Sequence, residues 1–259
     1  MTGKTIELYT EAIHRVNVTI AQGKVNKIRP FSVTCDFEKA LHAAVMVIYK
    51  DCRLNGCLFH LKQANRCYMK KTCGIEDEQV GHAMRKNVLD LLTILPRDEI
   101  TEYGIPYVRS ILDDLCKTDK ELKRWDKFWK YFVREWMQSP RYVKTWNIHD
   151  ENQEYLDLYN RTNNGLERYN RKLGEIFPSA HPSIIEFVVK LKEEGERQVQ
   201  KLNDVRAGKV NAPDHQELTV PLFVPRAYYD FQAAKKASVA ASVATAEMEA
   251  LQIDQESDR

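Results

Sequence analysis

The side chains best suited to chemistry are two carboxylates that lie far apart in the chain. Asp36 directly follows residues 28–35, a short run rich in β-forming residues, so we expect it at the carboxyl end of a strand. In open α/β sheets, functional sites are built at that end of the strands. Glu167 lies three residues after Asn164, a good N-cap, which is the spacing of a capping box. A purely structural role for Glu167 at this helix start stays open.

A Cys–His pair is the second candidate. Cys57 and His60 are three residues apart, a spacing at which both side chains can bind one metal ion. A structural zinc site normally takes four ligands from paired knuckles, and the neighbouring Cys67 and Cys73 have the wrong spacing for that. The simpler interpretation is that Cys57 is a buried residue at a strand end and His60 a hydrogen-bonded residue at a helix start.

The hydrophobic pattern predicts the elements that position these residues. Apolar residues recur at helical spacing in three segments, and two short β-rich runs separate them. The expected order is helix 5–21, strand 28–35, helix 38–49, strand 53–57 and helix 58–71. A strand, helix and strand joined by short links predict a βαβ unit with parallel strands and a right-handed crossover.

The motifs become more specific when they are taken in order. Asp36 stands in the sequence CDFEKAL, and Cys57 and His60 follow one helix and one strand later in NGCLFHLKQA. Beyond a helical segment comes RTNNGLERYN, which holds Thr162, Asn163, Asn164 and Glu167. Over roughly residues 5 to 200, this combination resembles the catalytic domain of Mutator-like element (MULE) transposases, which carry T-D-F-E-x-A-L, C-x-x-H and T-N-N-x-x-E motifs.

The resemblance implies an Asp-Asp-Glu triad on an RNase H-like fold, with Asp36 as the second Asp and Glu167 as the Glu. These carboxylates would hold two Mg²⁺ or Mn²⁺ ions, which activate the attacking hydroxyl and stabilise the leaving oxygen in phosphoryl transfer. The resemblance also implies DNA as the partner, strand cleavage and transfer as the activity, and the nucleus as the location. The expected fold class is a mostly helical α/β protein, with a partial RNase H-like core interrupted by a large all-helical insertion.

This interpretation divides the chain into four regions. Residues 1–78 form the βαβ part of the core, and residues 79–150 form the helical insertion. Residues 151–206 supply the C-terminal helices of the core. Residues 207–259 form a linker and an Ala-rich tail, which we expect to be marginal as a helix on its own and disordered at its acidic end.

The insertion carries an aromatic stripe at helical spacing. The stripe consists of Leu122, Trp125, Trp129, Phe132, Val133 and Trp136. We expect it to be part of the core rather than a platform for stacking nucleic-acid bases, because aromatic residues at this spacing usually line the buried face of a helix.

The first Asp of the family's triad has no counterpart in this sequence. In the family, the first Asp lies on a strand upstream of the helix that begins near Thr5, and no residue of this chain replaces it. We therefore expect a truncated, catalytically incomplete domain, unless another chain supplies that Asp. Without the upstream strand, residues 28–35 would present an unpaired apolar edge, which favours self-association or the addition of a partner strand.

The DNA contacts we expect are cations of the helix 58–71. Lys62, Arg66 and Lys70 fall on its predicted outer face, and Lys71 follows them. A solvated helix face explains the same pattern equally well. A function from a different class also stays open, in which the chain is a domesticated, non-catalytic module that binds DNA or protein.

The amino-acid composition narrows the classes of protein to which the chain can belong. The chain has 259 residues, 43% hydrophobic residues and a formal net charge of +2, which fits a globular protein without a strongly basic tail. Its six cysteines follow no disulfide-framework spacing, so we expect reduced thiols inside a cell. No apolar run is long enough to span a bilayer, and we expect no membrane partner.

Overall fold

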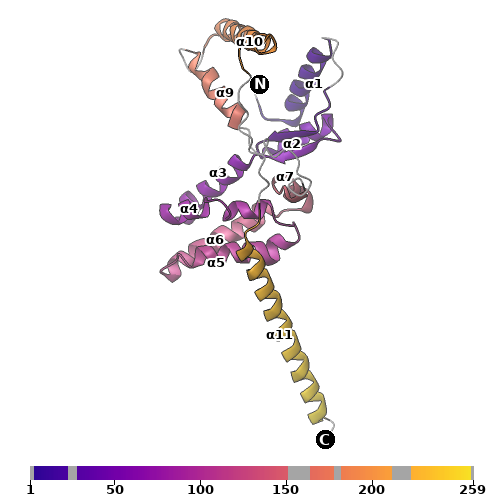
Figure 1. The fold of residues 1–259 in the computed structure, drawn as a ribbon, viewed down its shortest axis with the longest axis vertical. Helices are drawn as coiled ribbons and strands as arrows, with labels where there is room; N and C mark the ends of the chain where they lie inside the picture. The colour runs from indigo at the N-terminus through magenta and orange to yellow at the C-terminus, as the bar shows by residue number, and fades with distance from the viewer. Residues whose placement is uncertain (1–2, 23–27, 151–163, 178–181, 212–222, 258–259) are drawn as a thin grey trace.

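The computed structural model describes residues 3–22, 28–150, 164–177, 182–211 and 223–257. Its N-terminal part alternates helices and strands. The elements in order are α1 (Ile6–Gln22), β1 (Ser32–Cys35), α2 (Lys39–Ile48), β2 (Arg53–Gly56), α3 (Leu58–Tyr68) and the π-helical turn η1 (Met69–Cys73). The predicted mostly helical α/β architecture is therefore confirmed at this coarse level (Figure 1).

The small sheet is the predicted βαβ unit. β1 and β2 pair in parallel, with Ser32 opposite Arg53 and Cys35 opposite Gly56. Helix α1 packs on α2, and the Tyr49 hydroxyl donates a hydrogen bond of 2.8 Å to the Asn17 side chain. Within the described residues the sheet has only these two strands, so the second edge of β1 has no partner strand there.

The segment expected to be all-helical, which we call the insertion, consists of helices and helical turns in the structure. It consists of α4 (Asp77–Ala83), the 3₁₀ turn η2 (Leu89–Thr93), the π turn η3 (Ile100–Gly104), α5 (Ile105–Asp113), α6 (Asp119–Trp136) and α7 (Pro140–Trp146). Two of these helices begin at hydroxyl caps, since Thr118 accepts from the Glu121 N–H and Ser139 accepts from the Tyr142 N–H. Such caps satisfy backbone donors that have no partner within the helix.

The aromatic stripe of α6 lies in the core, as predicted. Trp125, Trp129, Phe132 and Trp136 are all buried. The inclusion of Val133 in this face is wrong, because its side chain is 43% exposed. Position 133 directly follows the buried Phe132, and one helical step of about 100° turns it towards solvent.

Polar side chains inside this core accept hydrogen bonds from two buried indoles, whereas the buried Trp129 indole N–H has no acceptor among the described residues. The Trp125 indole donates to Gln79 Oε1 at 3.2 Å, and the Trp136 indole donates to Asn65 Oδ1 at 3.1 Å. Asn65 has no exposed surface and donates from its own amide to the Leu61 carbonyl. These bonds tie α6 to α4 and α3 across long sequence separations.

Three further helices complete the described chain. They are α9 (Asn164–Glu175), α10 (Ile184–Arg206) and α11 (Arg226–Ser257). Figure 1 shows α1, α9 and α10 at one end of the molecule and α11 projecting from the other. The expected cap of α10 is present, since Ser183 Oγ accepts from the Glu186 N–H at 3.2 Å.

The Ala-rich tail differs from the prediction in two ways. Helix α11 continues to Ser257, so the acidic end is helical rather than disordered. Its first turn is also anchored in the insertion: Tyr228 is fully buried, its ring meets Tyr107 edge-on at 5.5 Å, and its hydroxyl donates to Glu99. The packing of one aromatic side chain thus fixes where the tail begins, which helix propensity alone does not reveal.

Removing the acceptor of the Trp136 indole tests the buried polar contacts. We expect Asn65→Ala to lower the free energy of unfolding by roughly 1–3 kcal/mol, because a buried N–H loses its partner. Urea denaturation measures the change. Arg66→Ala, at the exposed neighbouring position of α3, is the matched control and should shift stability by less than about 0.5 kcal/mol. Equal effects of the two substitutions would contradict this account.

Candidate functional site

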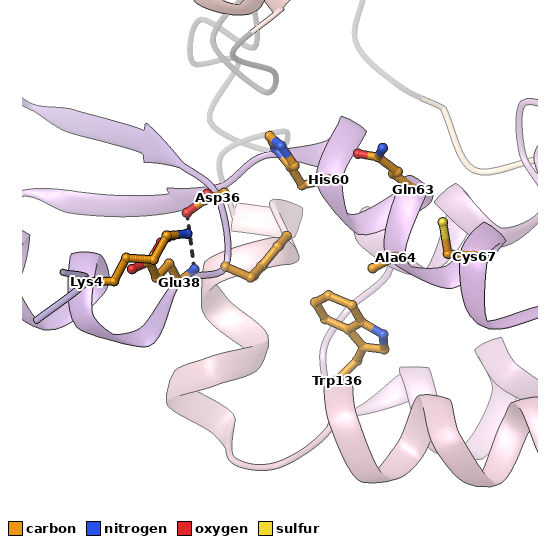
Figure 2. Close-up of a pocket in the computed structure, with 9 residues that line it drawn as sticks. Lys4, Asp36, Glu38, His60, Gln63, Ala64, Cys67 and Trp136 are labelled. Atoms are coloured by element: carbon orange, nitrogen blue, oxygen red, sulfur yellow. Dashed lines mark hydrogen bonds and ion pairs between the residues drawn. The ribbon is translucent and has the colours of Figure 1, made fainter. Parts of the chain in front are cut away.

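Asp36 lies where the sequence places it, directly after β1 at the carboxyl end of the parallel pair. It lines an open hollow of about 610 Å³ together with His60, which sits on the first turn of α3. Figure 2 shows both side chains, with Trp136 from α6 below His60. The βαβ unit thus brings two of the motif residues to one place.

The Asp36 carboxylate also has a local structural role. Its Oδ1 accepts a hydrogen bond of 3.2 Å from the Glu38 N–H, which forms an Asx turn leading into α2. The Asp36 backbone carbonyl accepts from His42 Nε2 at 2.6 Å. Burial lowers the pKa of His42, even though this hydrogen bond acts in the opposite direction. These contacts hold the backbone of Asp36 in place and fix the direction of its side chain.

The carboxylate of Glu38, beside Asp36, already has hydrogen-bonding partners within the protein. Glu38 forms an ion pair with Lys4 at 3.1 Å and accepts a hydrogen bond of 2.9 Å from the Tyr9 hydroxyl. Burial raises the pKa of Glu38, but the hydrogen bonds from Lys4 and Tyr9 outweigh it and the pKa is lowered. The hydrogen bond to Glu38 raises the pKa of Lys4, and the charge of Asp36 adds to this effect. Figure 2 shows Lys4 and Glu38 next to Asp36.

The floor of the hollow depends on a glycine. Phe37 contacts Trp136 edge-on with ring centroids 4.8 Å apart, and both residues line the hollow. A Cβ atom added at Gly56 would lie 2.3 Å from Cε1 of the Phe37 ring. No larger residue fits this end of β2 without moving Phe37. A glycine inside a strand pattern often marks such a close approach, and this signal was present in the sequence.

Cys57 and His60 lie in different environments. Cys57 is fully buried at the N-cap of α3, and its N–H donates to the Cys35 carbonyl at 2.8 Å. The prediction of a buried strand-end cysteine is therefore confirmed. His60 packs against the neighbouring Phe59 ring and faces the hollow. All six cysteines are free thiols, and among the described residues no three His, Cys, Asp or Glu side chains are grouped to hold a metal ion.

The structure leaves the second carboxylate of the expected site undefined. Helix α9 begins at Asn164, as the capping pattern predicts, and includes Glu167. Thr162 and Asn163 lie outside the described residues, and so do the side chains of Asn164 and Glu167. That Asp36 and Glu167 meet in one metal site therefore stays a prediction.

The four cations expected to contact DNA have different environments. The prediction that Lys62 faces outward is wrong, because its ammonium donates to the Met84 carbonyl at 2.8 Å and lies 3.5 Å from Asp90. Lys70 pairs with Asp77 at 2.7 Å. Arg66 and Lys71 are exposed and form no ion pair within the described residues. Of the four, these two are the most available to a phosphate.

Comparison of the chain with protein-family models, with curated proteins and with solved structures gave no match. None of the described helices is both long enough and apolar enough to cross a membrane.

The close contact at Gly56 yields a test of the hollow. We expect Gly56→Ala to lower the free energy of unfolding by about 1–3 kcal/mol, because the added methyl group must displace Phe37. Gly195→Ala on α10 is the control, since no atom lies within 4 Å of its added Cβ. That change should leave stability equal or raise it by up to about 1 kcal/mol. Urea denaturation of both variants measures the difference, and a neutral Gly56→Ala would contradict the packing described.

Proposed function

We propose that this chain is a MULE-type transposase domain protein related to DNA transposition, with an RNase H-like core. The observation that carries the proposal is the position of Asp36. It stands in the CDFEKAL motif at the carboxyl end of a parallel strand, and it shares a solvent-open hollow with His60 of the CxxH motif. The proposal places the protein in the nucleus, with DNA as its partner.

The proposed chemistry is metal-dependent cleavage and transfer of a phosphodiester strand. Asp36 offers the hard oxygen ligands that suit Mg²⁺ or Mn²⁺, and Glu167 on α9 is the second carboxylate we assign to the ion. A bound ion would activate the attacking oxygen and stabilise the leaving one. The protein's own contribution is to hold Asp36 in place, since the Glu38 N–H donates to its carboxylate and the His42 ring donates to its backbone carbonyl.

We assign two carboxylates to the metal site, Asp36 and Glu167, which is one fewer than the three that the family uses. Glu38 cannot replace the third without giving up its bonds to Lys4 and Tyr9. We therefore propose that the chain binds a divalent ion and DNA but is catalytically incomplete by itself. Arg66 and Lys71 are the DNA contacts that remain most available, while Lys62 and Lys70 first have to leave their acidic partners.

A second candidate function is a domesticated, non-catalytic module that binds DNA or protein. Lys4 is the observation that favours it. Its ammonium lines the same hollow as Asp36 and pairs with Glu38, so a positive charge already stands close to the place where the metal ion would bind. The proposed partner strand at residues 28–35 belongs to this candidate as well.

Binding of Mn²⁺ distinguishes the two candidates. If the metal site exists, Mn²⁺ should raise the melting temperature, because it binds the folded state. Asp36→Asn should weaken Mn²⁺ binding at least about tenfold, or about 1.4 kcal/mol, because an amide oxygen lacks the carboxylate charge. The Asn side chain can still accept the Glu38 N–H, so the fold is preserved. Isothermal titration calorimetry measures the affinity.

Asp98→Asn is the matched control, since Asp98 is exposed and lies outside the hollow. It should leave Mn²⁺ affinity unchanged. Lys4→Ala should strengthen Mn²⁺ binding, because it removes the competing charge. Unchanged affinity in Asp36→Asn, or no Mn²⁺ binding in either the natural chain or Lys4→Ala, would reject the metal site and leave the non-catalytic module.

A further inference from the structure

A second hollow of about 1070 Å³ extends from the beginning of the strands along α2, and it shares no lining residue with the Asp36 hollow. We call it the cationic groove and define it by Phe31, Lys39, Arg53, Arg141 and Lys144. Phe31 and Arg53 stand at the beginning of β1 and β2, Lys39 begins α2, and Arg141 and Lys144 lie on α7. The groove therefore runs between the βαβ unit and the helical insertion, where α7 packs beside β2.

An aromatic wall separates the two hollows. Tyr142 lines the cationic groove, whereas Phe37 and Trp136 line the Asp36 hollow. The Tyr142 ring stacks on Trp136 with centroids 6.2 Å apart and meets Phe37 edge-on at 6.3 Å. A ligand of the groove would thus occupy a different place from a metal ion bound at Asp36.

The charge of the groove is largely uncompensated. Its lining includes the cations Lys39, Arg53, Arg97, Arg141 and Lys144, against the carboxylates Asp51 and Asp150. Arg97 pairs with Asp150. Lys39, Arg141 and Lys144 are exposed and form no ion pair in the part of the chain that the structure describes. Three such cations around one concave surface favour a ligand with several negative charges.

An exposed aromatic ring stands at the same groove. Phe31 is 70% exposed, and the Arg53 guanidinium lies 5.8 Å from its ring centroid. The backbone of Phe31 is held in place, because its carbonyl accepts the Arg53 N–H at 2.9 Å. An exposed aromatic ring beside cations is the arrangement on which an unpaired base stacks while its backbone phosphates are neutralised.

We propose that the cationic groove binds single-stranded nucleic acid, with Lys39, Arg141 and Lys144 contacting phosphates and Phe31 stacking on a base. A base in a duplex is already stacked on both faces, so the exposed ring favours a single strand. An acidic peptide would use the cations but gains nothing specific from the ring. This site shares no residue with the Asp36 hollow, and it stands even if Mn²⁺ does not bind there.

Fluorescence anisotropy with a labelled 12-nucleotide oligo(dT) tests the proposal on the full chain. We expect salt-dependent binding that the triple variant Lys39→Glu, Arg141→Glu, Lys144→Glu weakens more than tenfold and with a shallower salt slope. The matched control is Lys120→Glu, Lys123→Glu, Lys130→Glu on α6, where the same charge change affects exposed lysines outside the groove. The control should retain most of the affinity.

Two substitutions of Phe31 test the proposed stacking on a base. Phe31→Ala should weaken oligo(dT) binding roughly tenfold, and Phe31→Tyr should retain it, since a phenol ring also stacks. Phe223→Ala is the control, because Phe223 is 69% exposed and lies outside the groove. The duplex of the same length should bind more weakly than the single strand.

Three results would overturn the proposal. One is equal affinity of the groove and control triple variants. Another is unchanged binding of Phe31→Ala together with duplex binding as tight as single-strand binding. The third is that polyglutamate displaces oligo(dT) and that Phe31→Ala leaves the affinity for both ligands unchanged. That result would identify the groove as a site for acidic peptides instead.

Discussion

Hydrogen bonds from three buried tryptophan indoles tie the helices of this fold together. An unpaired donor in the core costs about 1–3 kcal/mol, and of the four indoles only that of Trp129 lacks an acceptor among the described residues. Gln79 supplies one for Trp125, Asn65 one for Trp136, and the Trp136 carbonyl one for Trp146. These bonds fix α6 against α3, α4 and α7. Trp136 then reaches the edge of the βαβ unit, where it supports Phe37 and forms part of the hollow that Asp36 lines.

Local sequence patterns predicted the helices and strands well, because these elements depend mainly on residues that are close in sequence. The alternation of β-rich and amphipathic segments gave the parallel pair, and the resulting place of Asp36 at its carboxyl end follows from topology alone. The aromatic spacing of α6 predicted the core. The burial of Asn65 was not predicted, since a polar residue on an amphipathic helix is normally exposed. Only the position of Trp136, 71 residues away in sequence, explains it.

The surroundings of the site depended on long-range contacts that no motif encodes. Lys4 meets Glu38 across 34 residues, and Lys62 meets the Met84 carbonyl across 22. Helical periodicity placed Lys62 outside, but the insertion folds back over that side of α3 and brings Asp90 to it. The cationic groove was missed for the same reason, because its residues come from three separate segments. A clue was present in Phe31, an aromatic residue at the start of an apolar run.

The metal site that we propose requires Asp36 and Glu167 to hold the same ion. A double-mutant cycle of Mn²⁺ binding tests it most directly, using Asp36→Asn, Glu167→Gln and the double variant in calorimetric titrations. If both carboxylates bind the same ion, either single substitution should remove most of the affinity and the second should add little, so the two effects are strongly non-additive. Effects that simply add, or a Glu167→Gln variant with unchanged affinity, would show that the two residues do not share an ion and would contradict this account.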